Sequence, residues 1–547
     1  MKKINEGNAT RNTLLLIVIT FILRLLVAAY TGLGIGEAYY FRGAMHLDWS
    51  YFDQPPLFFW LSGASLKIFG LTNLGLRFPA VLLFAGTSWL LFVITRKLFN
   101  AAAGFWAVLI MNLSAVFTIP IACWFQPDAP LMFFWLLSAY FFVDVLSITS
   151  EGRAKLSTGR VYFLWLMVGV SMGLAILSKY HTIFLFLGVL IFISANKNQR
   201  HWLRHPGPYM ALVIAMLFAT PILWWNYHHQ WVSFAFQGSR AVSDGGLHPL
   251  WVLRSIGGQM LWLLPWLWFP LIRQLFYSFK MRNQSQSYSF LFWTAVLPLV
   301  FFTIVTLWND LQYHFHWQAP GYMMLFIPLG YAIDKKFSGS AEAQKGTRRW
   351  LTFSILFSAI TITVLNLHEV TGFWQSYGPR WVVGLHDSTP EQKAKEVDPT
   401  MQGVDYDGIY DRFVKEGWLN KPNLFAGTPR WWLVGKVDWA LKGQKDIVCF
   451  NTDPRNIVYL VDPNKLLGKD AIVIGQDTKV SVDNDVRPFF DTVKQLPDIT
   501  IFRNGRDELH LQVYYCTRFH VPAKPHEDLP VYHQLTGRPP FGKFNTY

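Results

Sequence analysis

Three short motifs place a carboxylate next to a long apolar run, and they are the residues of this sequence best suited to chemistry. Glu37 lies in the segment GEAYY, Asp53 in YFDQPP and Asp128 in QPDAP. A charge at membrane depth costs roughly 2.5–3.5 kcal/mol by insertion scales, so such residues are retained mostly where they function. Carboxylates at these positions could take a proton from a hydroxyl group or hold a divalent cation. We therefore predict Glu37, Asp53 and Asp128 as catalytic residues and leave a metal site at Glu37 and Asp53 open.

Basic side chains near the same face could bind an anion. Lys179 stands at the predicted outer end of a span, Arg240 in an aromatic outer loop, and His316 just ahead of the segment WQAP. Arg binds a phosphate through two parallel N–H groups and Lys binds it as a point charge, so both suit a lipid phosphate at a membrane surface. These three residues, together with Tyr40 and Tyr51 of the first two motifs, are the predicted substrate-binding residues.

The elements that must position these residues are mostly membrane spans. The 547-residue chain is 52% hydrophobic and 17% aromatic. Apolar runs long enough to cross a ~30 Å hydrocarbon core recur as far as residue 366 and then stop. The sequence therefore predicts a mainly α membrane protein followed by a different kind of domain. The eleven predicted spans lie near residues 13–31, 78–96, 103–122, 129–148, 161–177, 181–195, 209–225, 256–277, 290–307, 319–334 and 350–366.

Charge distribution predicts the orientation of the spans. With the N-terminus inside, inner segments hold 19 Lys and Arg, outer loops hold 6, and one, Arg24, lies within a span. Cytoplasmic loops carry such an excess, and an odd number of spans then places the tail outside. Arg24 is expected to pair with a neighbouring helix. The membrane part has 26 basic and 11 acidic residues, against 22 and 23 in the tail, so the basic balance reflects loops that face anionic lipid. Nucleic acid is not a predicted partner.

Residues 1–366 are predicted to form the membrane domain and residues 367–547 an α/β domain outside the membrane. Dense β-branched residues predict buried strands in this tail, and Asn504-Gly505 predicts the turn of a hairpin. Cys449 and Cys516 lie in a compartment that permits oxidation, and a disulfide and two unpaired thiols are both open. Strands are predicted at 447–450, 457–461, 471–474, 499–502 and 509–515, tail helices at 404–418 and 429–441, and an interfacial helix near 56–69.

Five motifs occur in an order that resembles one family. EAYY, YFDQPP and QPDAP are followed by LSKY at 177–180 and HWQAPGY at 316–322. This order resembles the bacterial polyprenyl-phosphate-sugar-dependent membrane glycosyltransferases related to protein O-mannosyltransferases and the lipid A aminoarabinose transferase, which are grouped in family 39. The likeness covers most of residues 13–366, and the tail is similar mainly in position and α/β character. It implies the C-type glycosyltransferase fold, with about eleven transmembrane helices here and an extracytoplasmic α/β domain.

The resemblance also implies a reaction. A sugar passes from a polyprenyl-phosphate donor to a hydroxyl of lipid A, another saccharide or a protein, with inversion, at the outer face of the inner membrane. The tail is then periplasmic. Such relatives open their first outer loop with an Asp-Glu pair, but here Gly36 takes the Asp position and only Glu37 remains. Their phosphate-contacting Lys is replaced by Gln54, which places more of the phosphate binding on Arg240 and Lys179.

The implied roles leave several questions open. Glu37 or Asp53 activates the acceptor hydroxyl, and Asp128 positions a group or binds a metal ion. No cofactor is required by a diagnostic spacing, although a divalent cation is compatible with the acids. The alternative function is a transporter or flippase of lipid-linked sugars, which would predict polar residues deep in several spans and broken helices in paired halves. Neither the sugar nor the acceptor can be identified from the sequence.

Overall fold

The computed structural model describes residues 6–148, 156–239, 246–309, 314–373, 398–476 and 479–541. The chain divides into two compact units, which are described separately. The membrane unit contains the described residues of Met1–Leu26, Gln54–Phe58 and Arg77–Thr361. The sheet unit contains Val27–Asp53, Phe59–Leu76 and the described residues of Ile362–Tyr547. The predicted boundary between residues 366 and 367 stays a prediction.

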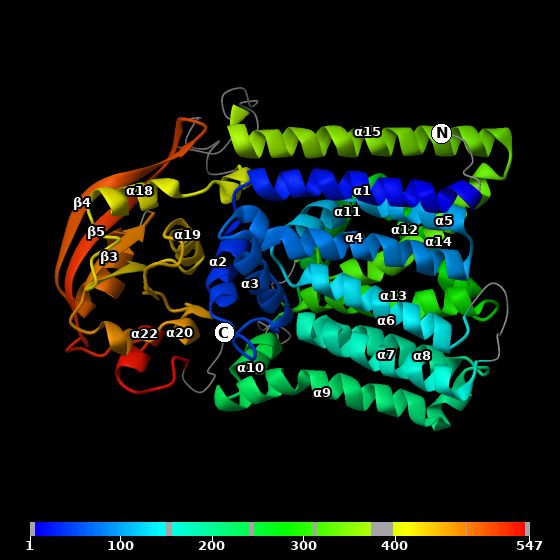
Figure 1. Ribbon diagram of the computed structural model, residues 1–547, viewed down its shortest axis with the longest axis horizontal. Coiled ribbons are helices and arrows are strands. Elements are labelled where there is room, and N and C mark those ends of the chain that lie inside the picture. The colour runs from blue at the N-terminus through cyan, green and yellow to red at the C-terminus, as the bar shows by residue number, and fades with distance from the viewer. Residues whose placement is uncertain are drawn as a thin grey trace. The chain divides into compact units, whose positions relative to one another are not determined.

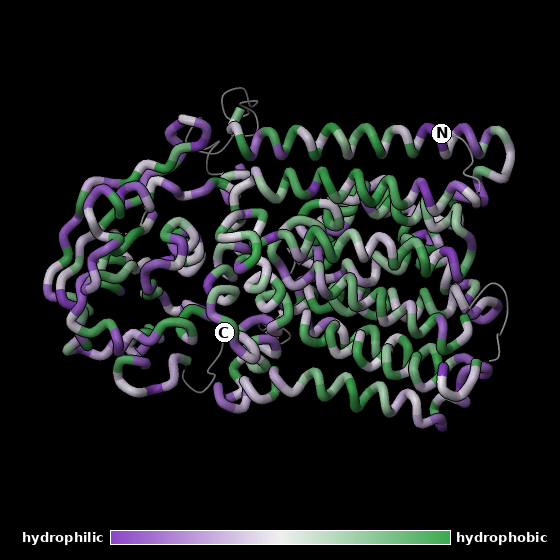
Figure 2. Tube along the Cα trace, in the orientation of Figure 1, coloured by the Kyte–Doolittle hydropathy of each residue, from purple (hydrophilic) through white to green (hydrophobic). Residues whose placement is uncertain are grey.

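The membrane unit is a bundle of long helices (Figure 1). Helix α7 packs against both α6 and α9, α8 against α13, and α5 against α14. Hydrophobic residues dominate along these helices and hydrophilic residues gather at the loops (Figure 2). Helices α1, α4 and α15 belong to this unit along most of their length. The helices of the unit are α1 (Glu6–Tyr30), α4 (Asn73–Leu98), α5 (Ala101–Leu113), α6 (Asp128–Val145), α7 (Thr158–Ser178), α8 (Ile183–Ala195), α9 (Pro206–His228), α10 (Val232–Ser239), α11 (Pro249–Leu263), α12 (Pro265–Met281), α13 (Gln286–Ile304), α14 (Ala319–Phe337) and α15 (Ala341–Thr371).

The prediction of a multi-pass membrane protein is confirmed. In the described residues, seven helices are long and apolar enough to cross a membrane, and an eighth span arises if the bent pair α11 and α12 counts as one. Three further apolar helices are shorter, so the count of eleven stays a prediction. Arg24 donates to Asn112 Oδ1 at 2.8 Å and lies over the Phe84 ring, which confirms its predicted pairing with a neighbouring helix.

The predicted single span at 256–277 is broken. Helices α11 and α12 meet at an angle of 111°. Leu264 between them has a φ of 71°, and Pro265 follows it. Proline disfavours a helical conformation of the preceding residue, which explains why the helix ends here although the apolar run continues.

The sheet unit is built on a five-stranded sheet in the order β2-β1-β3-β5-β4. Strand β1 pairs in parallel with β2 and β3, and the hairpin β4–β5 joins antiparallel to β3. Asn504 and Gly505 both have positive φ, as the predicted hairpin turn requires. The elements are α2 (Ile35–Met45), α3 (Leu57–Phe69, mostly in this unit), α18 (Asp407–Lys415), β1 (Leu424–Thr428), α19 (Trp431–Ala440), β2 (Ile447–Cys449), α20 (Ile457–Leu460), β3 (Asp470–Gly475), β4 (Phe490–Arg503), β5 (Arg506–Phe519) and α22 (Pro530–Leu535).

The strand predictions are confirmed except at 457–461. That segment forms the short helix α20, whose Ile457 and Val458 are buried. A short apolar run fits a buried helix turn as well as a strand, so β-branched density alone could not separate the two. The predicted helices at 404–418, 429–441 and 56–69 are present as α18, α19 and α3.

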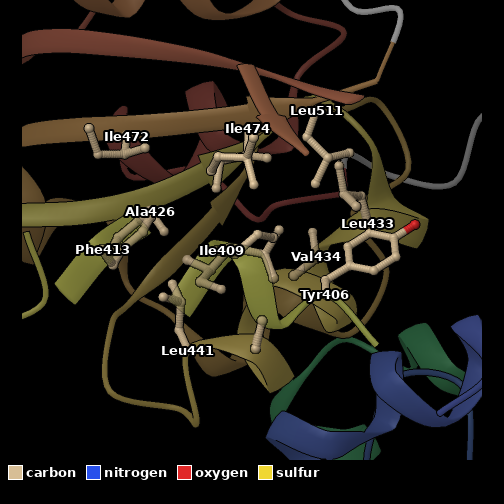
Figure 3. Close-up of a cluster of buried hydrophobic side chains, with 14 of the residues drawn as sticks. Tyr406, Ile409, Phe413, Ala426, Leu433, Val434, Leu441, Ile472, Ile474 and Leu511 are labelled. Carbon is tan, nitrogen blue, oxygen red and sulfur yellow. The ribbon is translucent and has the colours of Figure 1, made fainter. Parts of the chain in front are cut away.

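One face of the sheet packs against α18 and α19. Ile472 and Ile474 of β3 and Leu511 of β5 meet Ile409 of α18 and Leu433 of α19 in a buried cluster (Figure 3). Full burial of an aliphatic side chain contributes about 1.5–3 kcal/mol, so this layer fixes α19 firmly on the sheet. Helix α19 in turn contacts α2.

The two cysteines of the sheet unit are free and buried. Cys449 ends β2 and Cys516 lies on β5, with β1 and β3 between them. Strands lie ~4.8 Å apart, so three spacings far exceed the ~7 Å that a disulfide permits between Cα atoms. Of the two alternatives, the unpaired thiols are confirmed. Burial raises the pKa of the Cys516 thiol to about 12, which keeps it protonated.

Candidate active site

The membrane unit joins Asp128 and Lys179 in a buried ion pair. The Lys179 ammonium donates to both carboxylate oxygens of Asp128, at 2.9 and 3.0 Å. Asp128 is the first residue of α6, where a helix dipole favours a negative charge. Lys179 follows the last residue of α7, where the dipole favours a positive charge. Because α6 packs on α7, these two helix ends present the charges to each other.

His316 lies with this pair. It stands in the turn before α14. Burial lowers the pKa of His316 to about 4, while the Asp128 charge raises it and the Lys179 charge lowers it. The ring is therefore neutral near pH 7 and can donate one hydrogen bond and accept another. Three of the predicted site residues thus meet in the membrane unit.

A large apolar cavity is lined in part by residues that follow Lys179 in the chain. It has a volume of about 500 Å³ and lies among α7, α8 and α9. Tyr180 and Thr182, which follow Lys179, line one end with Phe234, and Trp202 lines the other end. The Thr182 hydroxyl donates to the Lys179 carbonyl at 2.9 Å, which fixes the chain at the charged end. This cavity could not be predicted from the sequence, because apolar residues that line a cavity and those that face lipid look alike.

The sheet unit holds the other predicted acids. Glu37 on α2 is buried, and its Oε2 accepts from the Gly34 N–H at 3.0 Å. One carboxylate oxygen thus caps the N-terminus of α2. Tyr51 is also buried and donates to the Gly43 carbonyl at 2.9 Å. Tyr40 lies edge-on to Phe59. Both tyrosines therefore help to hold the fold of the first outer loop.

Helix α2 is fixed by α19. Arg42 donates from two nitrogens to the two oxygens of Asp438, at 2.8 and 2.7 Å, and both side chains are almost fully buried. Lys436 of α19 donates to the Leu33 carbonyl ahead of α2. A Cβ at Gly435 would lie 2.2 Å from the backbone of Ala38, so only glycine permits this approach. The tail therefore positions the helix that carries Glu37.

Asp53 is buried in the sheet unit beside the segment that follows β2. Asn456 of that segment donates its backbone N–H to the Tyr39 hydroxyl at 2.8 Å. Its side-chain oxygen accepts from the Phe52 N–H at 3.0 Å. Arg455 lies next to this clamp. The sequence analysis missed both Asn456 and Arg455, because no motif links them to residues some four hundred positions earlier.

The predicted site residues thus form two groups. Asp128, Lys179 and His316 lie together in the membrane unit, and Glu37, Tyr40, Tyr51 and Asp53 lie in the sheet unit. Their convergence in one cavity stays a prediction, and Arg240 lies outside the described residues. Within the described ranges, no three His, Cys, Asp or Glu side chains are grouped so that they could hold a metal ion.

Sequence comparison gives relatives that include named sugar transferases. The family model described as "Dolichyl-phosphate-mannose-protein mannosyltransferase" matches residues 53–225. The undecaprenyl phosphate-alpha-4-amino-4-deoxy-L-arabinose arabinosyl transferase 2 of Proteus mirabilis is 25% identical over 363 residues, 62% of this chain and 60% of that protein. The lipid A galacturonosyltransferase RgtD of Rhizobium johnstonii is 26% identical over 225 residues, 39% of this chain and 43% of that protein. Each match spans less than two thirds of the relative.

The fold is that of a solved membrane glycosyltransferase. The crystal structure of ArnT from Cupriavidus metallidurans bound to undecaprenyl phosphate matches with a TM-score of 0.62 at 14% identity, over 91% of this chain and 97% of that one. The apo structure of the same protein also gives 0.62. The predicted C-type glycosyltransferase fold and the resemblance to these transferases are therefore confirmed.

Proposed function

We propose that this protein transfers a sugar from a polyprenyl-phosphate donor to an acceptor hydroxyl, with inversion at the anomeric carbon. The observation that carries the proposal is the apolar cavity of about 500 Å³ whose lining includes Tyr180, the residue that follows Lys179 in the chain. A polyprenyl phosphate has the matching parts, since its chain is wholly apolar and its headgroup is an anion. Ligand pockets commonly have volumes of about 300–1,000 Å³, so this cavity would hold part of a long chain.

Lys179 would bind the donor phosphate. In the described residues its ammonium donates only to Asp128, and one of its three N–H donors is left for a ligand. Arg240 is the proposed second cation. These charges would stabilise the polyprenyl phosphate as it leaves, because fixed charges aimed at developing negative charge lower the barrier. Asp128 would hold Lys179 in place before the donor arrives.

An acid of the sheet unit would activate the acceptor. Asp53 or Glu37 would take the proton of the acceptor hydroxyl while its oxygen attacks the anomeric carbon opposite the leaving phosphate. Glu37 uses one oxygen to cap α2, and the transfer assay decides between the two acids. The name of the Rhizobium johnstonii relative favours lipid A as the acceptor, whereas the description of the matching family names a protein.

A transfer assay tests this function. Proteoliposomes would receive radiolabelled polyprenyl-phosphate aminoarabinose, galacturonic acid or mannose together with lipid A. Loss of a general base typically lowers the rate roughly 10²–10⁴-fold, and we expect the transfer rate of Asp53→Asn to be lowered by a factor in this range. Asp498→Asn, at an exposed acid of the same unit, is the matched control. Equal rates for Asp53→Asn, Glu37→Gln and wild type would refute the catalytic assignment.

The same donors could instead be transported, and the break between α11 and α12 is the observation that favours a flippase. Polar groups at this break bond to one another, since Trp268 donates to the Tyr322 hydroxyl at 2.8 Å and Tyr322 donates to Gln259 Oε1 at 2.7 Å. Hydrogen-bonded polar networks of this kind stabilise a fold. Translocation of labelled donor without acceptor labelling in the proteoliposomes would establish the flippase.

The proposed location is the inner membrane, with the tail in the periplasm. The support is the excess of Lys and Arg in the predicted inner segments. A reporter fused after Tyr547 should report an external position, and one inserted near Gly346 an internal position. An internal signal from the first fusion would move the tail away from a periplasmic acceptor and would contradict the proposed site.

A further inference from the structure

The turn between α7 and α8 is connected to α6, α10 and α13 of the membrane unit. Its first residue, Lys179, donates to the carboxylate of the first residue of α6. The Tyr180 hydroxyl oxygen lies 3.0 Å from the Ser233 hydroxyl oxygen of α10, which is a hydrogen bond. The His181 ring stacks on Phe302 of α13, with ring centroids 4.4 Å apart. The turn therefore has a fixed place among these helices, and Tyr180 supplies its bond to α10.

Helix α10 is itself held in place by a buried amide. The side-chain oxygen of Asn226, near the end of α9, accepts from the backbone N–H groups of Ser233 and of the next residue, at 3.2 and 3.4 Å. Asn226 and Ser233 are both fully buried. Gln230 and Trp231, in the turn between α9 and α10, have φ values of 56° and 61°, a conformation that is uncommon for residues other than glycine. The chain thus retains a strained turn ahead of α10, and α10 brings the Ser233 hydroxyl against the α7–α8 turn.

Tyr180 also belongs to the wall of the apolar cavity. Tyr180 and Phe234 of α10 both line this cavity, and their rings meet edge to face with centroids 5.7 Å apart. Thr182 of the same turn lines the cavity as well, and its hydroxyl donates to the Lys179 carbonyl at 2.9 Å. The turn thus carries the proposed phosphate-binding cation at its first residue and part of the cavity wall in the residues that follow. A shift of the turn would change the position of the cation relative to α10.

We propose that Tyr180 is a positioning residue, whose bond to Ser233 sets the place of Lys179 relative to the polyprenyl chain of the donor. This rests on the proposed function, in which Lys179 binds the donor phosphate and the cavity holds part of the chain. A lysine ammonium is a point charge on a flexible four-carbon stem, so its place depends on how firmly its backbone is held. The phosphate and the chain of the donor are covalently joined, and both must reach their sites at once. The bond to α10 keeps these two sites in register.

Tyr180→Phe and Ser233→Ala each remove one hydroxyl of this bond, and phenylalanine keeps the ring in the cavity wall. Binding would be measured in nanodiscs with two ligands of the same chain length, a polyprenyl phosphate and the uncharged polyprenol. Each variant should weaken binding of the phosphate roughly 2–10-fold, the range that one hydrogen bond supplies. Binding of the polyprenol should stay unchanged, because it makes no use of Lys179. Tyr227→Phe, at a largely exposed tyrosine of α9, is the matched control and should change neither affinity.

A double-mutant cycle separates this role from a general contribution to the fold. In a Lys179→Ala background, Tyr180→Phe should cause no further loss of phosphate binding, because the cation that it positions is gone. Losses that multiply in the double variant would overturn the inference, and so would equal losses for the phosphate and the polyprenol. A phosphate preference that Tyr180→Phe and Ser233→Ala both retain in full would overturn the inference alone. Wild type that binds the phosphate no more tightly than the polyprenol would instead refute the phosphate site of the proposed function, and the inference with it.

Discussion

The two units each contain a buried ion pair, and the pairs differ in how completely they are bonded. Arg42 and Asp438 of the sheet unit meet through two parallel hydrogen bonds, and Arg42 also donates to the Lys445 carbonyl. Lys179 and Asp128 of the membrane unit meet through a single nitrogen beside an apolar cavity. Burial is similar in both pairs. The bonding pattern, and not burial, therefore distinguishes the two pairs. The fully bonded Arg42–Asp438 pair holds the fold, whereas Lys179 could exchange a bond to Asp128 for one to a ligand.

The largest effect is expected at Arg42. Arg42→Ala leaves Asp438 buried without its counter-charge, and loss of one partner of a buried pair typically costs about 3–5 kcal/mol. Since α2 is fixed to α19 through this pair, the sheet unit should lose its cooperative unfolding transition or much of its protein yield. Thermal unfolding in detergent would measure this. Arg487→Ala, which removes an exposed pair with Asp483, is the control. A normal unfolding transition for Arg42→Ala would show that the Arg42–Asp438 pair does not hold the fold, and the two pairs would then not differ in this respect.

The pair in the membrane unit should affect ligand binding more than stability. Lys179→Ala should weaken binding of polyprenyl phosphate roughly tenfold or more, because a hydrogen bond to a charged group is worth ~1.5–3 kcal/mol. Asp128→Asn should weaken it less, since Lys179 keeps its charge. A double-mutant cycle on donor Kd would give the coupling between the two residues. Donor affinity unchanged in Lys179→Ala would show that this pair, like Arg42–Asp438, serves the fold.

The cavity beside Lys179 can be tested independently of charge. Ala215 of α9 lines it, whereas Val213 on the same helix is exposed and does not. Ala215→Trp should fill part of the cavity and lower the affinity for a C55 donor severalfold, while a donor with a short chain should be affected less. Val213→Trp adds the same bulk on the exposed side of the helix, and the affinities for the long-chain and the short-chain donor should both stay unchanged. Equal affinities for the two variants would remove the cavity from the proposed donor site.

The sequence predicted features that leave a local pattern. Five ordered motifs indicated the fold, the period of apolar runs located most helices, and Asn504-Gly505 marked the hairpin. It did not predict the bend at Leu264, because the hydrophobic run continues through it. Strand β1 was also missed, although all five of its residues are buried. A strand this short, with glycine within it, has little β-propensity of its own.

The partners across the candidate site could not be predicted for a different reason. Lys179 and Asp128 were each identified as functional, but their direct pairing depends on how α6 packs on α7. Arg42 and Asp438 are 396 residues apart, and nothing in either neighbourhood encodes the other. Asn456, which bonds to Tyr39 and Phe52, is a similar case. A single sequence shows which side chains can do chemistry, and the packing of the elements decides which of them meet.

The smallest expected effect concerns a third buried network, around Asp398. This carboxylate accepts from the Thr400 N–H at 2.9 Å and lies 3.0 Å from His368 Nε2 and 3.3 Å from Arg503 Nη2. Burial raises the pKa of Asp398, but the bonds from Thr400 and the charges of His368 and Arg503 outweigh it and lower the pKa below its ordinary value.

Because the folded pKa of Asp398 is lowered, this group adds stability above the unfolded pKa of 3.8. That stability is lost as the pH falls through the folded pKa. Asp398→Asn should therefore melt below wild type at pH 7, and the gap should narrow as the pH falls from 5 toward 3. We expect the charge of Asp398 to contribute less than about 1 kcal/mol to the free energy of unfolding. The difference in Tm between Asp398→Asn and wild type, measured by scanning calorimetry in detergent, should then be ~2–4 °C at most. A gap that stays constant with pH would mean that Asp398 holds its neighbours through shape and neutral hydrogen bonds. The sheet unit would then contain a buried acid whose charge contributes nothing to the fold. The bonding pattern would then no longer separate buried charges that hold the fold, such as Arg42, from those that could bind a ligand, such as Lys179.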